Sequence, residues 1–226
     1  MKGVIFDFNG TMFFDSPLHL KAWKERARVY FGKNLTDREV EQNIQGRSNH
    51  LILSYLSSSP LSKEEERRIG LEKEKRYRKL VRENPSLSLA PGLLSFLSLL
   101  KEHQVPLAIA TSSEKTNRAF YLKTFPLLDY FEKKNIVYDD GSFTKGKPDP
   151  EIYQVAIHRI GLHPSDCVIF EDSLSGLESA YKAKAGRIVL VKDTSYPPSF
   201  PLPSYVDATI DSYAERKQKI LDFIGI

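Results

Sequence analysis

The chain has 226 residues, 41% of them hydrophobic, so it is long enough to bury a substantial core, alone or with a smaller second domain. Its 33 basic and 29 acidic residues give a net charge of +4. Nucleic-acid binders usually concentrate basic charge much more strongly on one face, so this balance does not indicate a nucleic-acid partner.

Further features predict a soluble cytoplasmic protein. Cys167 is the only cysteine, which excludes an intrachain disulfide, and its apolar neighbours indicate a buried side chain. The first apolar run reaches Asp7 too early for a secretory signal, and no run approaches the roughly 20 residues that cross a bilayer. A monomer and a small homo-oligomer both remain open.

Short apolar runs alternate with helical patterns along most of the chain. The runs are expected strands at 4–6, 106–110, 136–138, 168–170 and 188–191, with a weaker candidate at 206–209. The helical stretches between them cover 92–102, 115–125, 150–160 and 175–184. This alternation predicts an α/β fold with a doubly wound parallel sheet, in which ligands lie beyond the carboxyl ends of the strands.

Residues 15–88 interrupt this alternation and contain no convincing strand. They predict a small all-helical cap domain, inserted into an α/β core made of residues 1–14 and 89–226. Within the cap, residues 63–83 are dense in charge, and opposite charges recur four residues apart. This spacing predicts a solvated helix with its own ion pairs, namely Glu64–Arg68, Glu72–Arg76 and Glu74–Arg78.

Asp7 follows the first predicted strand and is followed in turn by Asn9 and Gly10. A carboxylate at a strand end can attack phosphorus and form an aspartyl-phosphate. Gly10 allows a sharp turn whose backbone amides can face an anion, so we consider it a candidate substrate-binding residue. The same segment could also be only a turn that ends a strand.

Two later segments offer groups that could hold a phosphate. Thr111 and Ser112 follow the second predicted strand, where a hydroxyl and the next amides could bind a phosphoryl oxygen or cap a helix instead. Lys147 precedes Pro148 and Pro150, which stiffen the chain ahead of a helix. Its ammonium could neutralise both a phosphate and Asp7, although a lone lysine is more often solvated.

Glu171 and Asp172 follow the predicted strand at 168–170. Two carboxylates beside another acidic strand end would repel one another without a cation. Hard oxygen ligands next to a phosphate suit Mg²⁺. The alternative is that Asp172 or Ser173 only caps the next helix.

In order and spacing, these four motifs resemble those of the haloacid dehalogenase superfamily, and the resemblance extends over nearly the whole chain. The insertion between the first two motifs is similar to the small helical cap of that family. The beta-phosphoglucomutase-like phosphatases are the most similar subgroup, judging by Asp15, His19, Trp23 and the Gly46–Arg47–Ser48 segment.

The resemblance implies a Rossmann-like core and a Mg²⁺-dependent phosphatase that acts on a small phosphorylated metabolite, such as a sugar phosphate. It assigns the nucleophile to Asp7 and the grip on the phosphoryl group to Thr111 and Lys147. The implied Mg²⁺ ligands are Asp7, the backbone carbonyl of Asn9, and Asp172, with Glu171 nearby or acting through water.

Three residues are candidates for contacts between the cap and the substrate. Arg47, Lys73 and His19 carry the donors or charge that a phosphorylated ligand would need. Each could equally be a surface or packing residue.

Asn9 departs from the family pattern, which has an aspartate two residues after the nucleophile. That aspartate protonates the leaving group and later activates water, whereas an asparagine cannot exchange a proton. Losing such a group typically costs roughly 10²–10⁴-fold in rate. The metal-binding carbonyl belongs to the backbone, so metal binding should survive.

Three functions remain open at this point. The first is a hydrolase that is slow or borrows another base such as His19, with detectable but low Mg²⁺-dependent hydrolysis of aryl or sugar phosphates. The second is a mutase or a phosphotransferase that stalls as its aspartyl-phosphate. The third is a non-catalytic protein that binds or senses a phosphorylated metabolite. We favour the hydrolase, and the pair Glu171–Asp172 argues against a metal-free dehalogenase.

Overall fold

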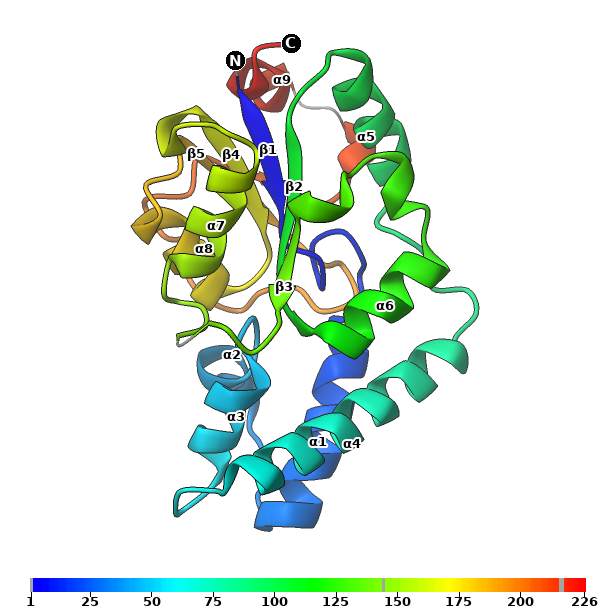
Figure 1. Ribbon diagram of the computed structural model, residues 1–226, viewed down its shortest axis with the longest axis vertical. Helices are drawn as coiled ribbons and strands as arrows, with labels where there is room; N and C mark the ends of the chain where they lie inside the picture. The colour runs from blue at the N-terminus through cyan, green and yellow to red at the C-terminus, as the bar shows by residue number, and fades with distance from the viewer. Residues whose placement is uncertain (1, 144, 216–217) are drawn as a thin grey trace.

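The computed structural model describes residues 2–143, 145–215 and 218–226, and these form a six-stranded parallel sheet flanked by helices (Figure 1). The strands lie in the order β3-β2-β1-β4-β5-β6, so the chain winds outward from β1 in both directions. Their bounds are β1 Gly3–Phe6, β2 Leu107–Glu114, β3 Ile136–Asp139, β4 Cys167–Glu171, β5 Arg187–Val191 and β6 Ala208–Ile210. The predicted doubly wound α/β fold is confirmed.

Both faces of the sheet are buried because successive side chains of each strand point to opposite sides. In β1, Val4 and Phe6 belong to one hydrophobic cluster and Ile5 to another. The first cluster packs under α5 (Leu93–Glu102), α6 (Lys115–Thr124) and α9 (Gln218–Ile224). The second packs under α7 (Glu151–Arg159) and α8 (Leu174–Lys182). Helices α5 to α8 start and end within a few residues of the predicted bounds, whereas α9 was not predicted.

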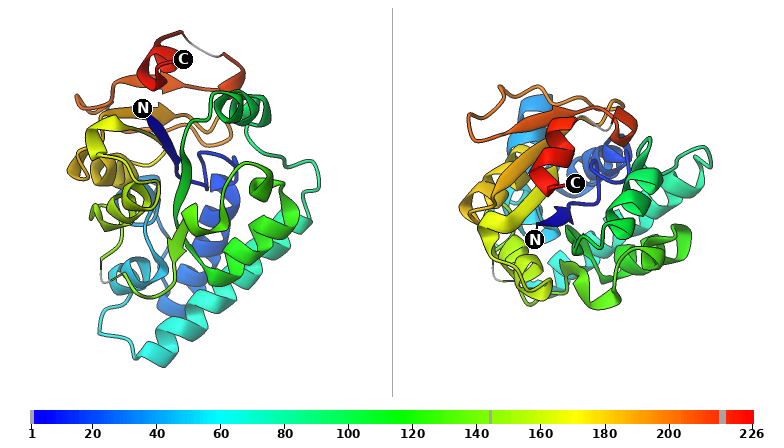
Figure 2. Two further views of the ribbon diagram at one scale, coloured as in Figure 1. Left: turned by 45° about the horizontal axis from the view of Figure 1, so that its top comes forward. Right: turned by 90° about the horizontal axis from the view of Figure 1, so that it is seen from above.

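Four further helices lie beyond one end of the sheet, away from the two chain termini (Figures 1 and 2). They are α1 Ser16–Phe31, α2 Asp37–Asn43, α3 Asn49–Leu56 and α4 Lys63–Arg82, and we call residues 15–88 the cap. The helices α2 and α4 each begin with a capping box, in which the first polar side chain and a glutamate three residues later satisfy each other's backbone amides. The cap has its own hydrophobic cluster around Trp23 and Ile52, whereas Tyr77 and Leu80 of α4 join the core under the sheet.

Two predicted strands differ from the observed ones. The strand β2 continues through Thr111 and Ser112 to Glu114, because after an irregularity it pairs with β3 again at Asp139. The next helix is therefore capped by Glu114, whose carboxylate accepts hydrogen bonds from the first-turn amides. The last strand begins at Ala208 rather than at residue 206, because the residues before it form a turn.

The ion pairs predicted within the charged cap helix are wrong. This helix packs along α1 and against α6, so its charged side chains reach other elements instead of the next turn. Arg76 binds Glu25 at 2.7 Å, and Arg78 lies 3.5 Å from Glu114. Glu74 is buried instead of solvated. The pairs that do form four residues apart within the helix are Arg68–Glu72 and Lys79–Glu83.

Two simpler expectations can be compared directly. Cys167 is buried at 1% exposure, as its apolar neighbours predict. Among the residues that the structure describes, no helix combines the length and the hydrophobicity that a bilayer-spanning segment needs.

Candidate active site

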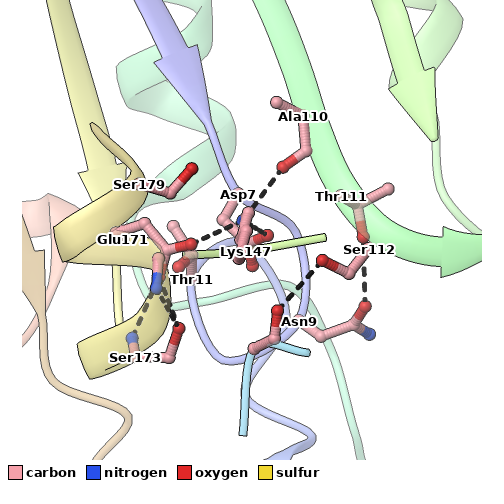
Figure 3. Close-up of polar contacts among 12 residues, drawn as sticks. Asp7, Asn9, Thr11, Ala110, Thr111, Ser112, Lys147, Glu171, Ser173 and Ser179 are labelled. Carbon is pink, nitrogen blue, oxygen red and sulfur yellow. Dashed lines mark hydrogen bonds and ion pairs between the residues drawn. The ribbon is translucent and has the colours of Figure 1, made fainter. Parts of the chain in front are cut away.

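Three charged side chains meet at the carboxyl edge of the sheet (Figure 3). Asp7 follows β1, Glu171 ends β4, and Lys147 reaches them from the loop before α7. The Lys147 ammonium lies 2.6 Å from Asp7 Oδ1 and 2.5 Å from Glu171 Oε1, and it also donates to the Tyr153 hydroxyl at 3.0 Å. Lys147 is completely buried, so these partners are what make its charge tolerable.

The carboxylates here exceed the nearby positive charge. Asp7, Glu171 and Asp172 each offer an oxygen within 4.8 Å of the others, against the single ammonium of Lys147. Burial raises the pKa of Asp7 to about 7, even though Lys147 opposes the shift. Burial, followed by the repulsion of Glu171 and Asp7, raises the pKa of Asp172 well above its usual range. Such a set of hard oxygen donors lacks a countercharge and suits a divalent cation.

Glu171 differs from its two acidic neighbours because both of its oxygens already accept several hydrogen bonds. Oε1 accepts from Lys147 and from the Tyr153 hydroxyl, and Oε2 accepts from the amides of Asp172 and Ser173. Gly176 is required beside it, since a Cβ there would lie 1.7 Å from Glu171 Oε1. This carboxylate is therefore fixed in place and orients Lys147.

Asp172 is held more loosely, and from both parts of the molecule. Its Oδ1 accepts a hydrogen bond from Thr11 at 3.2 Å, and its Oδ2 accepts one from Gln45 of the cap, also at 3.2 Å. Gly10 has a φ of 79°, and a Cβ there would lie 2.1 Å from Asp172 Oδ2. Only glycine therefore allows the turn after Asp7 to approach this carboxylate.

The Asn9 side chain is bound on both sides of its amide. Its Nδ2 donates to Asp15 Oδ2 at 2.8 Å and to the Tyr121 hydroxyl at 2.9 Å. Its Oδ1 accepts a hydrogen bond from Ser113 at 2.7 Å and a longer one, of 3.5 Å, from Thr111. An amide is the group that this environment fits, because it must donate toward a buried carboxylate and accept from a hydroxyl.

The hydroxyl groups after Ala110 take separate places. Thr111 is buried, and its Oγ1 accepts a hydrogen bond from the Ser113 amide at 3.1 Å. Ser112 instead donates to the carbonyl of Gly46 at 3.0 Å, so it joins the core to a loop of the cap. Both line the same cavity as Asp7, which places all three within one site.

The three predicted cap residues line this cavity of about 80 Å³ as well. Lys73 is only 2% exposed and donates to His19 Nδ1 at 2.8 Å and to Glu74 Oε1 at 3.0 Å. Arg47 turns back on its own segment, where Nε and Nη2 donate to the Gln42 carbonyl at 3.1 and 2.9 Å.

His19 is held as a neutral imidazole. Burial, followed by the adjacent ammonium of Lys73, lowers its pKa. Its Nδ1 accepts from Lys73, so the proton resides on Nε2, which faces Asp15 Oδ2 at 3.4 Å. The ring also stacks on Tyr77 with centroids 3.7 Å apart. In this arrangement neither ring nitrogen offers a lone pair to a water molecule at the site.

Several residues that complete the site were missed by sequence reasoning. Tyr153 binds both Lys147 and Glu171, Tyr121 binds Asn9, and Gln45 binds Asp172. Only Gln45 had a signal, because it immediately precedes the Gly46–Arg47–Ser48 segment. The tyrosines lie on amphipathic helices, where an aromatic residue indicates core packing.

Comparison with known proteins supports the same reading as the fold. Residues 1–184 match the family model described as haloacid dehalogenase-like hydrolase. A phosphorylated carbohydrates phosphatase of Thermotoga maritima is 31% identical over 192 residues, which cover 83% of this chain and 84% of the relative. Beta-phosphoglucomutase of Bacillus subtilis is 27% identical over 191 residues, covering 81% and 80% of the two chains.

A solved structure gives the same result in three dimensions. The haloacid dehalogenase hydrolase of Entamoeba histolytica, family IA variant 3, superimposes with a TM-score of 0.85 at 31% identity and covers all of both chains. Because the family model and the curated relatives each span about four fifths of the chain and the solved structure spans all of it, the chain belongs to the haloacid dehalogenase-like hydrolases, in their beta-phosphoglucomutase-like subgroup.

Proposed function

We propose that this hydrolase is a Mg²⁺-dependent phosphatase that transfers the phosphoryl group of a small metabolite to Asp7 and then releases it slowly as phosphate. The observation that carries the proposal is the buried contact of Lys147 with Asp7 and Glu171, beside the uncompensated carboxylate of Asp172. A nucleophile, a fixed cation and an acidic ligand set at one strand edge are the parts that phosphoryl transfer requires.

In the first step, an oxygen of Asp7 attacks phosphorus as the bond between phosphorus and the leaving-group oxygen breaks. The departing oxygen takes its proton from water, because Asn9 has none to give. Lys147 already contacts Asp7 Oδ1, which leaves Oδ2 as the attacking atom. The ammonium then lies beside the negative charge that spreads over the phosphoryl oxygens. We assign the Thr111 hydroxyl and the amides after Asp7 to the remaining phosphoryl oxygens.

We infer that Asp7, the Asn9 backbone carbonyl and Asp172 hold the metal. Glu171 would remain outside the direct ligand set because its oxygens are occupied. Mg²⁺ bound there would neutralise the acidic cluster and the phosphate and would leave coordination positions for water.

In the second step, water must attack the aspartyl-phosphate and lose a proton. Asn9 cannot take that proton, and both of its functional atoms are already hydrogen-bonded. His19 does not replace it, since Nδ1 is occupied by Lys73 and Nε2 carries the proton. We therefore expect both steps to be slow, with the covalent intermediate accumulating only for leaving groups, such as phenols, that depart without needing a proton.

Phosphorylated carbohydrates are the substrate class that we propose, because the Thermotoga maritima relative is named for them. In this proposal residues 15–88 act as a separate cap domain that closes over the phosphate and selects the leaving group. Gly46 supports this role, since it lies against Ser173 of the core, and Ser112 binds its carbonyl.

The direct test is release of inorganic phosphate from a panel of sugar, polyol and aryl phosphates, with Mg²⁺ and with EDTA. Slow release that requires Mg²⁺ is expected, and Asp7→Asn should abolish it. Asp166→Asn is the matched control, because this carboxylate lies at the surface beside Lys2. Release that persists in Asp7→Asn, or none from any substrate, would contradict the proposal.

A further inference from the structure

The cap side of the cavity carries a second set of groups that the phosphoryl-transfer chemistry does not use. Four buried apolar side chains form one part of it, namely Leu20, Trp23, Ile44 and Ile52. The polar part contains Lys73 and Glu74, which are neighbours on α4 and are each 2% exposed. We call these six residues the cap wall. The cap wall faces the leaving group of a phosphate ester whose phosphate lies beside Asp7.

The positive charge of Lys73 is neutralised inside the wall. Its Nζ lies 3.0 Å from Glu74 Oε1, which also accepts from Asn49 at 2.9 Å, while Glu74 Oε2 accepts from Asn117 at 2.6 Å. Although burial opposes ionisation, the charge of Lys73 and the hydrogen bonds from Asn49 and Lys73 lower the pKa of Glu74. The pair is thus an ammonium beside a carboxylate, and it presents no net charge to a ligand.

Among the described residues that line the cavity, Arg47 is the other cation, and it changes this balance little. Arg47 lines the cavity, but two of its guanidinium nitrogens donate to the backbone of Gln42. A phosphate carries about −1.5 to −2 charges near pH 7. A second phosphate would therefore lie against a carboxylate and four apolar side chains, with one partly engaged guanidinium to receive it.

We propose that the cap wall selects phosphate monoesters with a compact, uncharged leaving group and rejects bisphosphates, and that Glu74 determines this selectivity. The inference rests on the proposed phosphatase function and narrows its substrate class. Apolar side chains next to a neutral ion pair suit the C–H faces and hydroxyl groups of a polyol or sugar. They provide no free counterion for a second phosphate, so the same selectivity disfavours a mutase that a bisphosphate must prime.

The test compares the affinities of matched ligands by calorimetry with Mg²⁺, in the Asp7→Asn variant so that turnover does not interfere. The pairs are glucose 6-phosphate with glucose 1,6-bisphosphate and fructose 6-phosphate with fructose 1,6-bisphosphate. We expect each monophosphate to bind at least tenfold more tightly than its bisphosphate. Adding Glu74→Gln, which keeps the size of the side chain and removes its charge, should narrow that ratio at least threefold.

Glu72→Gln is the control on the same helix, because Glu72 pairs with Arg26 near the surface and should leave the ratio unchanged. A bisphosphate that binds as tightly as its monophosphate, or a ratio that Glu74→Gln leaves unchanged, would overturn the inference. If Glu74→Gln fails to fold, the ratio of monophosphate to bisphosphate affinity in the Asp7→Asn protein alone decides whether the cap wall rejects bisphosphates. Monophosphate binding without phosphate release by the unmodified chain would refute the phosphatase and leave this inference standing. If no monophosphate binds, both fail.

Discussion

Asn9→Asp is the substitution that most directly tests why turnover should be slow. It changes one NH₂ group to an oxygen and keeps the shape of the side chain. That NH₂ group donates to Asp15 Oδ2 at 2.8 Å and to Tyr121 at 2.9 Å. The substitution therefore places a half-buried carboxyl group within hydrogen-bonding distance of the buried Asp15 carboxylate, and it supplies the proton-exchanging group that position 9 lacks.

The distance decides the protonation state of the new pair. Two unit charges 2.8 Å apart repel by about 6 kcal/mol at an effective dielectric constant of about 20. Protonating an ordinary aspartate at pH 7 costs about 4 kcal/mol, because each pKa unit is worth about 1.4 kcal/mol. Protonating one carboxyl costs less than the repulsion between two charged ones. The pair should therefore share one proton at neutral pH, and the pKa of the introduced carboxyl should be raised. That proton is available to the leaving group.

The expected result is a rise in kcat of roughly 10²–10⁴-fold, measured as the initial rate of phosphate release with Mg²⁺. At pH 7, protonating the new pair costs about 4 kcal/mol, and the hydrogen bond made by the shared proton offsets part of that cost. The free energy of unfolding should therefore fall by about 2 kcal/mol. The pKa of the introduced carboxyl is higher in the folded than in the unfolded protein, so acid favours the folded state. The loss of stability should therefore shrink toward pH 4 and grow as the pH rises through the pKa of the folded protein. Asn9→Ala, which supplies no acid, should show no gain in rate. A folded Asn9→Asp protein that is no faster than the original chain would refute the reasoning.

Three other outcomes follow from the geometry. Lys147→Met leaves Asp7 and Glu171 buried without their cation, so it should abolish phosphate release and lower the free energy of unfolding by about 3–5 kcal/mol in denaturant titrations. Burial raises the pKa of Cys167 to about 12, so a thiol reagent at pH 8 should label this residue only at the rate of unfolding. For the same reason, the free energy of unfolding should decline as the pH rises from about 9, the ordinary thiol pKa, through about 12. Arg78→Ala removes hydrogen bonds from the cap to α6, so hydrogen exchange in α4 should accelerate by about tenfold, whereas an unchanged rate would mean that these contacts do not hold the cap.

Local sequence patterns were sufficient to predict the sheet and most helix bounds. Apolar runs such as 168–170 are buried on both faces of a parallel sheet, and this requirement is visible without knowing the partner strands. The continuation of β2 to Glu114 was not visible, because it depends on pairing with Asp139 in another strand. The predicted pairing of Glu74 with Arg78 failed for the same reason, since α4 packs against α6 and its charges find partners there.

The candidate site was predictable where one residue type carries one chemical role. Asp7 and the acidic pair lie at strand ends, which parallel strands bring together, whereas Lys147 comes from the loop ahead of α7. The partners of Asn9 were not predictable, because Asp15, Tyr121 and Ser113 come from three different segments and only the fold aligns them. The same is true of Lys73, a predicted cap-side substrate contact whose pairing with Glu74 was not visible in the sequence.

The contacts of Asn9 also connect the catalytic loop with the cap. Asp15, which accepts from Asn9, accepts a hydrogen bond from Tyr77 of α4 as well, and Tyr77 in turn accepts one from Tyr121 of the core. Asp15 is thus stabilised by one donor from the catalytic loop and one from α4. An amide at position 9 donates to that carboxylate whatever the pH, whereas a carboxyl there needs a proton to do so. Asn9 therefore makes the loop's hydrogen bonding independent of protonation, at the expense of the proton transfer that fast hydrolysis needs.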